Sequence, residues 1–341
     1  MVLRYAVLPP LFFSILSTRP VPAAITFTGT CDGSAAVALD PDHFLDLNDE
    51  SNAVRVYDRR GGAEVQSFDP SSALGLASSD EGDFEDAARV GDRVYVIGSH
   101  GRTKDGALAP ARGRFFGMDL GGTTPALSIT VAGSYDALLD DMLDDTRWVT
   151  PDASAIAALA ASTGVGIAVD DHLAPEAQGT NIEGLAAFKG GLAIGFRNPG
   201  MGDRALVVTL ENPDDVLHAT VPRTHARLGR AYALDLGDRG VRGMTWSTEH
   251  DAMLILAGPR GGSGAFALYR WSGEATDAPS LVTDIAAPKD SAPEAIVATP
   301  GSLEVLVVFD QGGAAIGRKT CKKAAPAAQQ FSGIMLRVPR R

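Results

Sequence analysis

The chain has 341 residues, 45% of them hydrophobic, and a formal net charge of −12 with no basic run. This length and composition suffice for a sizeable core, and closed β-folds of this size often form a single domain. The acidic balance argues against binding to nucleic acids and against adhesion to anionic lipid.

The first residues have the pattern of an export signal. Arg4 supplies the charged start, residues 6–16 are apolar, and small residues end the segment at Ala23 and Ala24. We predict that residues 1–24 are a signal peptide and residues 25–341 the mature domain, in the periplasm or secreted. The apolar run is shorter than a typical membrane span, so we expect no stable span after signal removal. A frayed cytosolic N-terminus is the alternative.

After a lone strand at residues 24–30, one pattern recurs five times. Each copy begins with a polar residue that enters an apolar strand, followed by a turn, a strongly apolar strand and a third strand. The polar anchors are Ser34, Glu85, Glu183, Arg242 and Glu294, at steps of 51, 98, 59 and 52 residues. Units of roughly 40–50 residues with about four strands are typical of propeller blades. We predict an all-β fold, a single β-propeller with five blades. A six-bladed propeller and a β-sandwich with chance similarity remain alternatives.

The long step between Glu85 and Glu183 contains a helical pattern at residues 135–162. Leu138, Leu139 and Met142 fall on one helical face. Thr150 and the proline after it have the pattern of a helix start, and an alanine-rich segment follows up to Gly164. We therefore predict a short helical insertion rather than a sixth blade.

The repeat predicts a polar ring at one mouth of the propeller channel. The first strand of each blade lines the channel, and the second strand ends at the mouth where the first begins. This arrangement places the five anchors together and surrounds them with His100, Arg102, Arg197, Asn198 and Arg260. Convergent polar groups at a concave mouth indicate a ligand site. We expect a small or anionic ligand of unknown identity, or a role as an interaction scaffold.

Three glutamates that face one another across a channel repel unless they are paired or bound to metal. Arg242 is the obvious counter-charge, and Ca²⁺ held by Glu85, Glu183 and Glu294 is the alternative. The structural alternative is that the repeat acids accept hydrogen bonds from backbone amides and lock the blades together.

The alternative function is a metal-assisted phosphoester or ester hydrolase. Glu183 and Glu294 would then hold Ca²⁺, Arg102 and Arg197 would bind an anionic group, and His100 would act as the acid–base catalyst.

Cys31 and Cys321 are the two cysteines of the chain, and an even pair suggests a disulfide in an oxidising compartment. The last repeat lacks an outermost strand, and the strand at 24–30 lacks a blade. If that strand pairs with the last blade, the blade loses its exposed edge, and Cys31 and Cys321 lie at the same end of that blade. We predict a Cys31–Cys321 disulfide, with two free thiols as the alternative, and we expect a monomer.

Several segments carry a family resemblance over about residues 33–310. They resemble an uncharacterised bacterial family, domain of unknown function 3616, in FEDAARVGDRVYVIGSH, NIEGLAAFKGGLAIGFRNP, VRGMTW and PEAIV. The resemblance implies a propeller-like fold and no established activity. A looser similarity, mainly in the turn–strand signature EGL, is to the esterase-like relatives of propeller phytases. It is too short to transfer catalytic residues.

Overall fold

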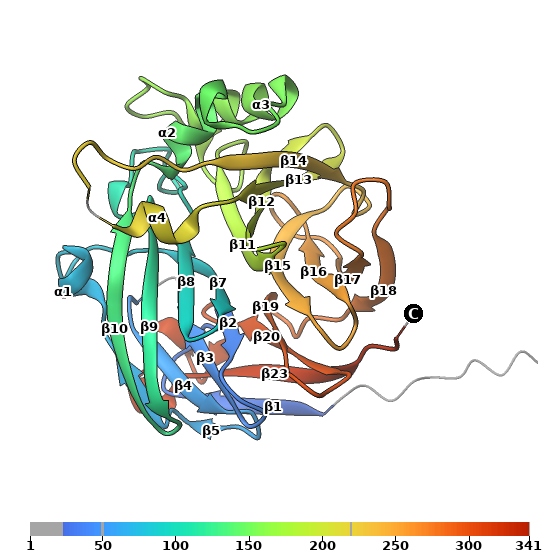
Figure 1. Cartoon of the computed structure of the whole chain (residues 1–341). Coiled ribbons are helices and arrows are strands. Elements are labelled where there is room, and N and C mark those ends of the chain that lie inside the picture. Colours follow the sequence, from blue (N-terminus) through green and yellow to red (C-terminus); the bar gives the residue numbers. More distant parts are fainter. Residues whose placement is uncertain (1–22, 49–50, 219, 341) are drawn as a thin grey trace, which may run out of the picture.

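Each of the five sequence repeats folds into one antiparallel sheet of the structure, a computed structural model that describes residues 23–48, 51–218 and 220–340 (Figure 1). The sheets form a β-propeller with five blades, as predicted. Residues 1–22 of the predicted signal peptide lie outside the described residues. None of the described helices is long and apolar enough to cross a membrane.

The first four blades each contain four strands, ordered from the channel outwards. Blade I contains β2 (Ala35–Ala38), β3 (His43–Leu47), β4 (Val54–Asp58) and β6 (Gln66–Phe68). Blade II contains β7 (Phe84–Val90), β8 (Arg93–Gly98), β9 (Phe115–Thr123) and β10 (Ala126–Tyr135). Blade III contains β11 (Asn181–Phe188), β12 (Gly191–Met201), β13 (Arg204–Leu210) and β14 (Leu228–Leu234). Blade IV contains β15 (Gly240–Ser247), β16 (Ala252–Gly258), β17 (Phe266–Trp271) and β18 (Ser280–Ile285).

Blade V joins the two ends of the chain. Its strands are β19 (Ala292–Ala298), β20 (Glu304–Asp310), β23 (Gln330–Arg337) and β1 (Ala24–Thr28), with β5 (Gly62–Ala63) parallel to β1 on the outside. β1 pairs antiparallel with β23 and thereby supplies the missing outer strand. A disulfide joins Cys31 to Cys321 with the Cα atoms 5.8 Å apart. Both the predicted closure and the predicted disulfide are confirmed.

An aromatic cluster packs blade V against blade I. The rings of Phe27 and Phe331 stack with centroids 4.9 Å apart, and Phe44 and Tyr57 of blade I contact them edge-on. All four side chains are fully buried. Burial of such a side chain contributes about 1.5–3 kcal/mol, so this seam holds β1 in place together with the disulfide.

The predicted helical insertion lies between β10 and β11. It contains α2 (Leu138–Leu143), η2 (Asp145–Arg147), α3 (Ala153–Thr163) and η3 (Asp171–Leu173). Asp152 caps α3 by accepting hydrogen bonds from the backbone N–H groups of Ser154 and Ala155, so the helix starts two residues after the predicted Thr150 cap. Figure 1 shows α2 and α3 together at one edge of the propeller, beside blade III.

The insertion is held by burial of its apolar face. Leu138, Met142 and Leu159 belong to one buried cluster with Ile194 and Phe196 of β12. The remaining short elements connect strands, and they are α1 (Ser71–Leu74), η1 (Pro110–Arg112), α4 (Pro213–Leu217), β21 (Ala315–Ile316), β22 (Lys319–Thr320), η4 (Cys321–Lys323) and η5 (Pro326–Ala328).

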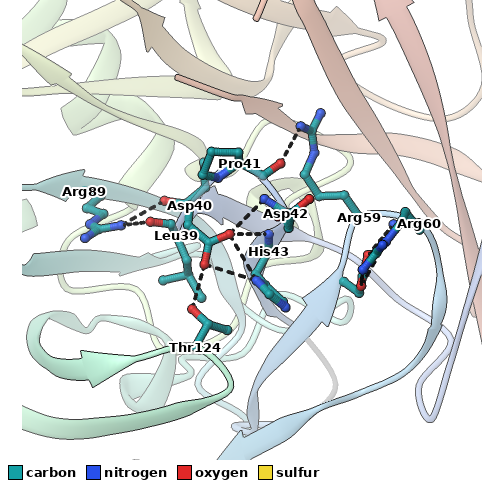
Figure 2. A network of polar contacts seen from close by, with 11 residues as sticks. Leu39, Asp40, Pro41, Asp42, His43, Arg59, Arg60, Arg89 and Thr124 are labelled. Atoms are coloured by element: carbon teal, nitrogen blue, oxygen red, sulfur yellow. Dashed lines mark hydrogen bonds and ion pairs between the residues drawn. The ribbon is translucent and has the colours of Figure 1, made fainter. Parts of the chain in front are cut away.

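The turn between β2 and β3 is tied to blade II by a polar network (Figure 2). The Asp40 carboxylate accepts hydrogen bonds from the backbone N–H groups of Asp42 and His43 at 2.8 and 2.9 Å, and from the Thr124 hydroxyl at 2.8 Å. Partial burial acts to raise the pKa of Asp40, but these hydrogen bonds hold it below its usual value. Arg89 of β7 donates to the Leu39 carbonyl. The network therefore has a structural role at the junction of two blades.

Candidate functional site

The polar anchors of blades II to V stand at β-bulges of the inner strands. In each blade the pairing with the second strand skips one residue, and the skipped residues are Glu85, Glu183, Arg242 and Glu294. A bulge turns one side chain out of the regular alternation and is common beside functional sites. The polar anchor of the sequence repeat therefore coincides with a bulge of the backbone. The bulge directs one side chain per blade to the same mouth of the channel.

Arg242 lies between two of the glutamates and pairs with both. Its Nε is 2.9 Å from Oε2 of Glu183, and Nη2 contacts Oε1 of Glu294. Burial acts to lower the pKa of Arg242, but the charges of Glu183, Glu294 and Glu85 outweigh it and raise that pKa. Ser34 of blade I donates to Glu294 at 3.5 Å, and Arg197 donates to Glu183 at 3.1 Å. The predicted counter-charge role of Arg242 therefore has direct geometric support.

Asp86, one residue after Glu85, locks three blades together. One carboxylate oxygen accepts from the backbone N–H of Leu185 at 2.7 Å and of Met244 at 3.1 Å, and the other accepts from Ala87 at 2.8 Å. Its side chain is buried, and burial raises its pKa well above the usual value. Asp86 therefore has the kind of locking role that we considered for the repeat acids, and for Glu85, Glu183 and Glu294 that role stays a prediction.

The predicted ligand-binding residues at the boundary of blades III and IV contact one another. The carbonyl of Arg260 accepts from Nε of Arg197 at 3.0 Å and from Nδ2 of Asn198 at 2.8 Å. Asn198 also donates to the carbonyl of Pro175 at 3.1 Å, and Arg260 donates to that of Gly202 at 2.8 Å. These three side chains join neighbouring blades and the segment that follows the insertion.

Arg102 supports the insertion. Its terminal nitrogens donate to five backbone carbonyls at 2.9–3.4 Å, those of Gly106, Thr163, Gly164, Ile167 and Ala168. The hydrolase alternative needs Arg102 and Arg197 to bind an anion. In the structure Arg102 is engaged with the end of α3, and Arg197 is engaged with Glu183 and a carbonyl.

No group of three potential ligand atoms from the ring glutamates lies within 4.8 Å in the described part of the chain. The described group that meets this criterion is Asp170, Asp171 and His172, in the polar loop after α3, and two of its members are exposed. Ca²⁺ at Glu85, Glu183 and Glu294 therefore remains a prediction, and Arg242 already supplies positive charge between two of them.

His100 lines a cavity of about 390 Å³ between the β8–β9 loop and the insertion, and we call it the insertion cavity. Its other lining residues include Arg102, Leu108, Arg114 and Thr163. His100 has a left-handed backbone with φ of 54°, which is uncommon for a residue other than glycine. Such strained positions are often found at functional sites.

The imidazole of His100 has one satisfied nitrogen and one unsatisfied nitrogen. Nδ1 lies 2.9 Å from the carbonyl of Gly98, so Nδ1 carries the proton and donates it. Nε2 is then an acceptor, and it is buried without a hydrogen-bond partner among the described residues. Burial lowers the pKa of His100 to about 4, so the ring is neutral at pH 7.

Two arginines of the same cavity also have an unsatisfied nitrogen. Nε of Arg102 and Nε of Arg114 are buried and have no hydrogen-bond partner within the described residues. The large majority of buried polar atoms in folded proteins are paired, and an unpaired one costs about 1–3 kcal/mol. Three such atoms from the lining of one cavity indicate a place where a polar ligand or water completes the structure.

Asp141 of α2 is the second polar anchor of the insertion. Its carboxylate accepts from the hydroxyl of Tyr135, from the backbone N–H of Ala226 at 2.7 Å, and faces Nδ1 of His225 at 2.7 Å. Asp141 and Arg102 thus fix the two sides of the insertion that roofs the cavity. The Asp141 partners His225 and Ala226 lie 84 and 85 residues away along the chain, so the sequence pattern alone does not show this role.

A second cavity, of about 290 Å³, lies at the other end of the channel, where the inner strands finish. Its lining is mostly small residues from all five inner strands, among them Ala38, Ala87, Ala186, Thr245 and Ala298. We call it the channel cavity. It lies away from the bulge residues, and the polar side chains of its lining are mainly those of Arg89, Thr245, Ser247, Thr248 and Thr299.

The low pKa of His100 predicts a pH-dependent stability. In the unfolded chain the imidazole binds a proton near pH 6.5, and in the folded protein near pH 4. Between these values the unfolded state binds more protons, so stability falls as the pH is lowered. At pH 4.5 this contribution amounts to roughly 2.5 kcal/mol relative to pH 7.

The variant His100→Asn isolates this effect, because asparagine tolerates the left-handed backbone and does not titrate. Urea unfolding at pH 7 and pH 4.5 should show the wild type losing more stability than the variant. Parallel losses in the two proteins would show that His100 is as easily protonated when folded as when unfolded.

Comparisons with known proteins find one family model and several solved structures that match this chain. Residues 154–314 match the model of a family described as a protein of unknown function, DUF3616, which confirms the resemblance over that part of the chain. No curated protein matches the chain. The phytase-relative resemblance remains a resemblance only.

Several solved structures share the architecture at low identity. The glutaminyl cyclase of Myxococcus xanthus is 12% identical, with 93% of this chain and 96% of that chain covered and a TM-score of 0.46. A chain of the mitotic checkpoint complex is 11% identical, with coverages of 96% and 99% and a TM-score of 0.39. The β-propeller domain of Cps50 (Swd1) from Myceliophteria thermophila is 10% identical, with coverages of 90% and 84% and a TM-score of 0.35. Likeness at this level carries no information on activity.

Proposed function

We propose that the protein is an extracytoplasmic β-propeller that binds a small polar ligand in the insertion cavity. The observation that carries the proposal is the set of three unsatisfied buried nitrogens on His100, Arg102 and Arg114, all from residues that line this cavity. The main charges of the ring of bulge residues are paired with one another, and in the insertion cavity Arg114 pairs with Asp136, which also lines it, at 3.3 Å. The ligand site is therefore displaced outwards from the channel axis to the boundary of blade II and the insertion.

The hydrogen-bonding roles of the three nitrogens indicate which groups the ligand must carry. Nε2 of neutral His100 accepts a hydrogen bond, so the ligand offers a hydroxyl or amine donor. Nε of Arg102 and of Arg114 donate, so the ligand also offers an acceptor, and a carboxylate gains most from a charged donor. A small hydroxycarboxylate meets both requirements.

An extracytoplasmic location is supported by the disulfide between Cys31 and Cys321, because such bonds persist mainly in oxidising compartments. The bond closes the propeller between its first and last segments. A fold that depends on it is suited to the periplasm or the exterior of the cell.

Isothermal titration with glycolate and lactate tests the proposal, with acetate and propionate as matched acids that lack the hydroxyl. We expect the hydroxy acids to bind more tightly than the matched acids. His100→Asn should weaken hydroxy-acid binding by about threefold to tenfold, the usual value of one neutral hydrogen bond. The affinity for acetate and propionate should stay unchanged.

A cavity-filling pair of variants locates the site. Thr163 is half-buried at the end of α3 and lines the insertion cavity, so Thr163→Trp directs a large side chain into it from the rim. Thr245 lines the channel cavity, and Thr245→Trp is the matched control. Loss of binding in Thr163→Trp alone supports the proposal. Loss in Thr245→Trp alone would move the site to the opposite mouth.

A further inference from the structure

Four large apolar side chains are exposed beside the insertion cavity. Leu108, Val165, Ile167 and Val169 are 59%, 73%, 43% and 64% exposed, and we call them the apolar loop patch. Ala107, the neighbour of Leu108, pairs with Val169, so the two segments lie side by side. Single exposed apolar residues are ordinary on protein surfaces, whereas a contiguous group marks a binding surface.

The backbone beneath this patch is held firmly. Arg102 donates to the carbonyls of Thr163, Gly164 and Ile167 at 2.9–3.0 Å. Gly106 has φ of 75°, and a Cβ atom there would lie 1.8 Å from the carbonyl oxygen of Asp170, so glycine permits the close approach of the two segments. A surface fixed in this way loses little conformational entropy when it is covered.

The patch is continuous with the insertion cavity. Leu108 and Thr163 line the cavity, and Arg102 both lines it and binds the loop that carries Val165 and Ile167. The charged residues around the loop are Lys104, Asp105, Asp170 and Asp171. This rim is net negative, so the carboxylate of an anionic ligand belongs at the arginines of the cavity and not at the loop.

We infer that the ligand is amphipathic, with its polar head in the insertion cavity and an aliphatic chain on the apolar loop patch. The inference rests on the proposed function and names the class of its ligand, a hydroxycarboxylic acid with a medium-length alkyl chain. The head satisfies His100 and the two arginines. The chain covers side chains that are otherwise exposed to water.

A homologous series of hydroxy acids measures how strongly the alkyl chain of the ligand contacts the apolar loop patch. The probes are 3-hydroxybutyrate, 3-hydroxyhexanoate, 3-hydroxyoctanoate and 3-hydroxydecanoate, titrated below their micelle concentrations. Complete burial of a methylene strengthens binding about fourfold, so contact on one side gives about twofold for each methylene. Across six methylenes the dissociation constant should fall roughly sixtyfold.

The double variant Val165→Thr/Ile167→Thr tests the surface, with Val221→Thr as the control. Val221 is fully exposed in a separate loop, so its substitution changes hydrophobicity elsewhere on the molecule. In the double variant the affinity should depend much less on chain length, because two of the four side chains of the patch are replaced, while the shortest acid loses little affinity. In Val221→Thr the dependence should remain.

Failure of the inference and failure of the proposed function would give different results. If 3-hydroxybutyrate binds with His100-dependent affinity and the longer acids bind equally, the inference is wrong and the proposed function stands. If long acids bind but Thr163→Trp and His100→Asn have no effect, or if no acid binds, the proposed function fails as well. Cosedimentation of the wild type, and not of the double variant, with phosphatidylcholine vesicles would assign the patch to a membrane and overturn the inference.

Discussion

The double variant Cys31→Ser/Cys321→Ser is expected to lose more than about 4 kcal/mol of unfolding free energy. The bond joins residues 290 positions apart, and chain-entropy models give about 4.7 kcal/mol for a loop of 100 residues and more for longer ones. Both sulfurs are buried at the end of blade V where β1 pairs with β23. Removal of the bond therefore weakens the junction at which the propeller closes.

Urea unfolding of the oxidised wild type and the double variant measures this loss, and reduced wild type serves as the matched control. Hydrogen exchange should become faster first in β1 and in its partner β23. A loss below about 1 kcal/mol, with β1 still protected, would show that the aromatic seam alone closes the ring.

The variant Arg242→Met is expected to lose about 3–5 kcal/mol, because removal of one partner leaves buried charges uncompensated. Arg242 is 5% exposed and pairs with Glu183 and Glu294. Arg197 still pairs with Glu183 in this variant, so the charge chiefly affected is that of Glu294, which should bind a proton at higher pH than in the unfolded chain. The folded variant then binds more protons, so its deficit in stability should shrink as the pH is lowered from 7 to 5.

The triple variant Arg242→Met/Glu183→Gln/Glu294→Gln is the control, because it removes the repelling charges as well. It should recover a large part of the lost stability. If Arg242→Met has nearly wild-type stability at pH 7, or if the triple variant is no more stable than the single one, the charge pairing is not what holds this mouth together.

The blade pattern could be predicted because it rests on short-range features of the sequence. A polar residue before a small-residue strand and a turn before a more apolar strand recur with the period of a blade. Glu183 and Glu294 occupy equivalent positions in the inner strands of their blades, as the repeat implies. The closure was predictable for a related reason, since one strand and one blade edge lacked partners and Cys31 and Cys321 flanked them.

The candidate site was less predictable because it depends on contacts between distant segments. The acceptors of Arg102 include carbonyls more than 60 residues away along the chain. The sequence could therefore place this arginine near the mouth, but it could not show that its guanidinium donates to the insertion. Arg114 stands directly before a strand and shows no motif. Its place near His100 follows from backbone hydrogen bonds at the ends of β8 and β9, where the Gly98 N–H donates to the Arg114 carbonyl at 2.8 Å.

The position of Asp86 illustrates the same limit. The sequence pattern drew attention to Glu85, while the neighbouring carboxylate forms the interblade hydrogen bonds. A bulge reverses which of two adjacent side chains points inwards, and the sequence shows no sign of where the extra residue sits. A shift of one residue in register therefore decides whether a carboxylate lies at the channel mouth, like that of Glu85, or is buried and joins the blades, like that of Asp86.

Crystals of the full mature chain soaked with a library of small hydroxy acids and matched acids test the central claim most directly, because the electron density shows where each compound binds. We expect the hydroxy acids to occupy the insertion cavity, with a hydroxyl at hydrogen-bond distance from Nε2 of His100 and an acceptor near Arg114. Compounds that gather in the channel cavity or among Glu85, Glu183 and Glu294, with the insertion cavity left free of them, would contradict this claim.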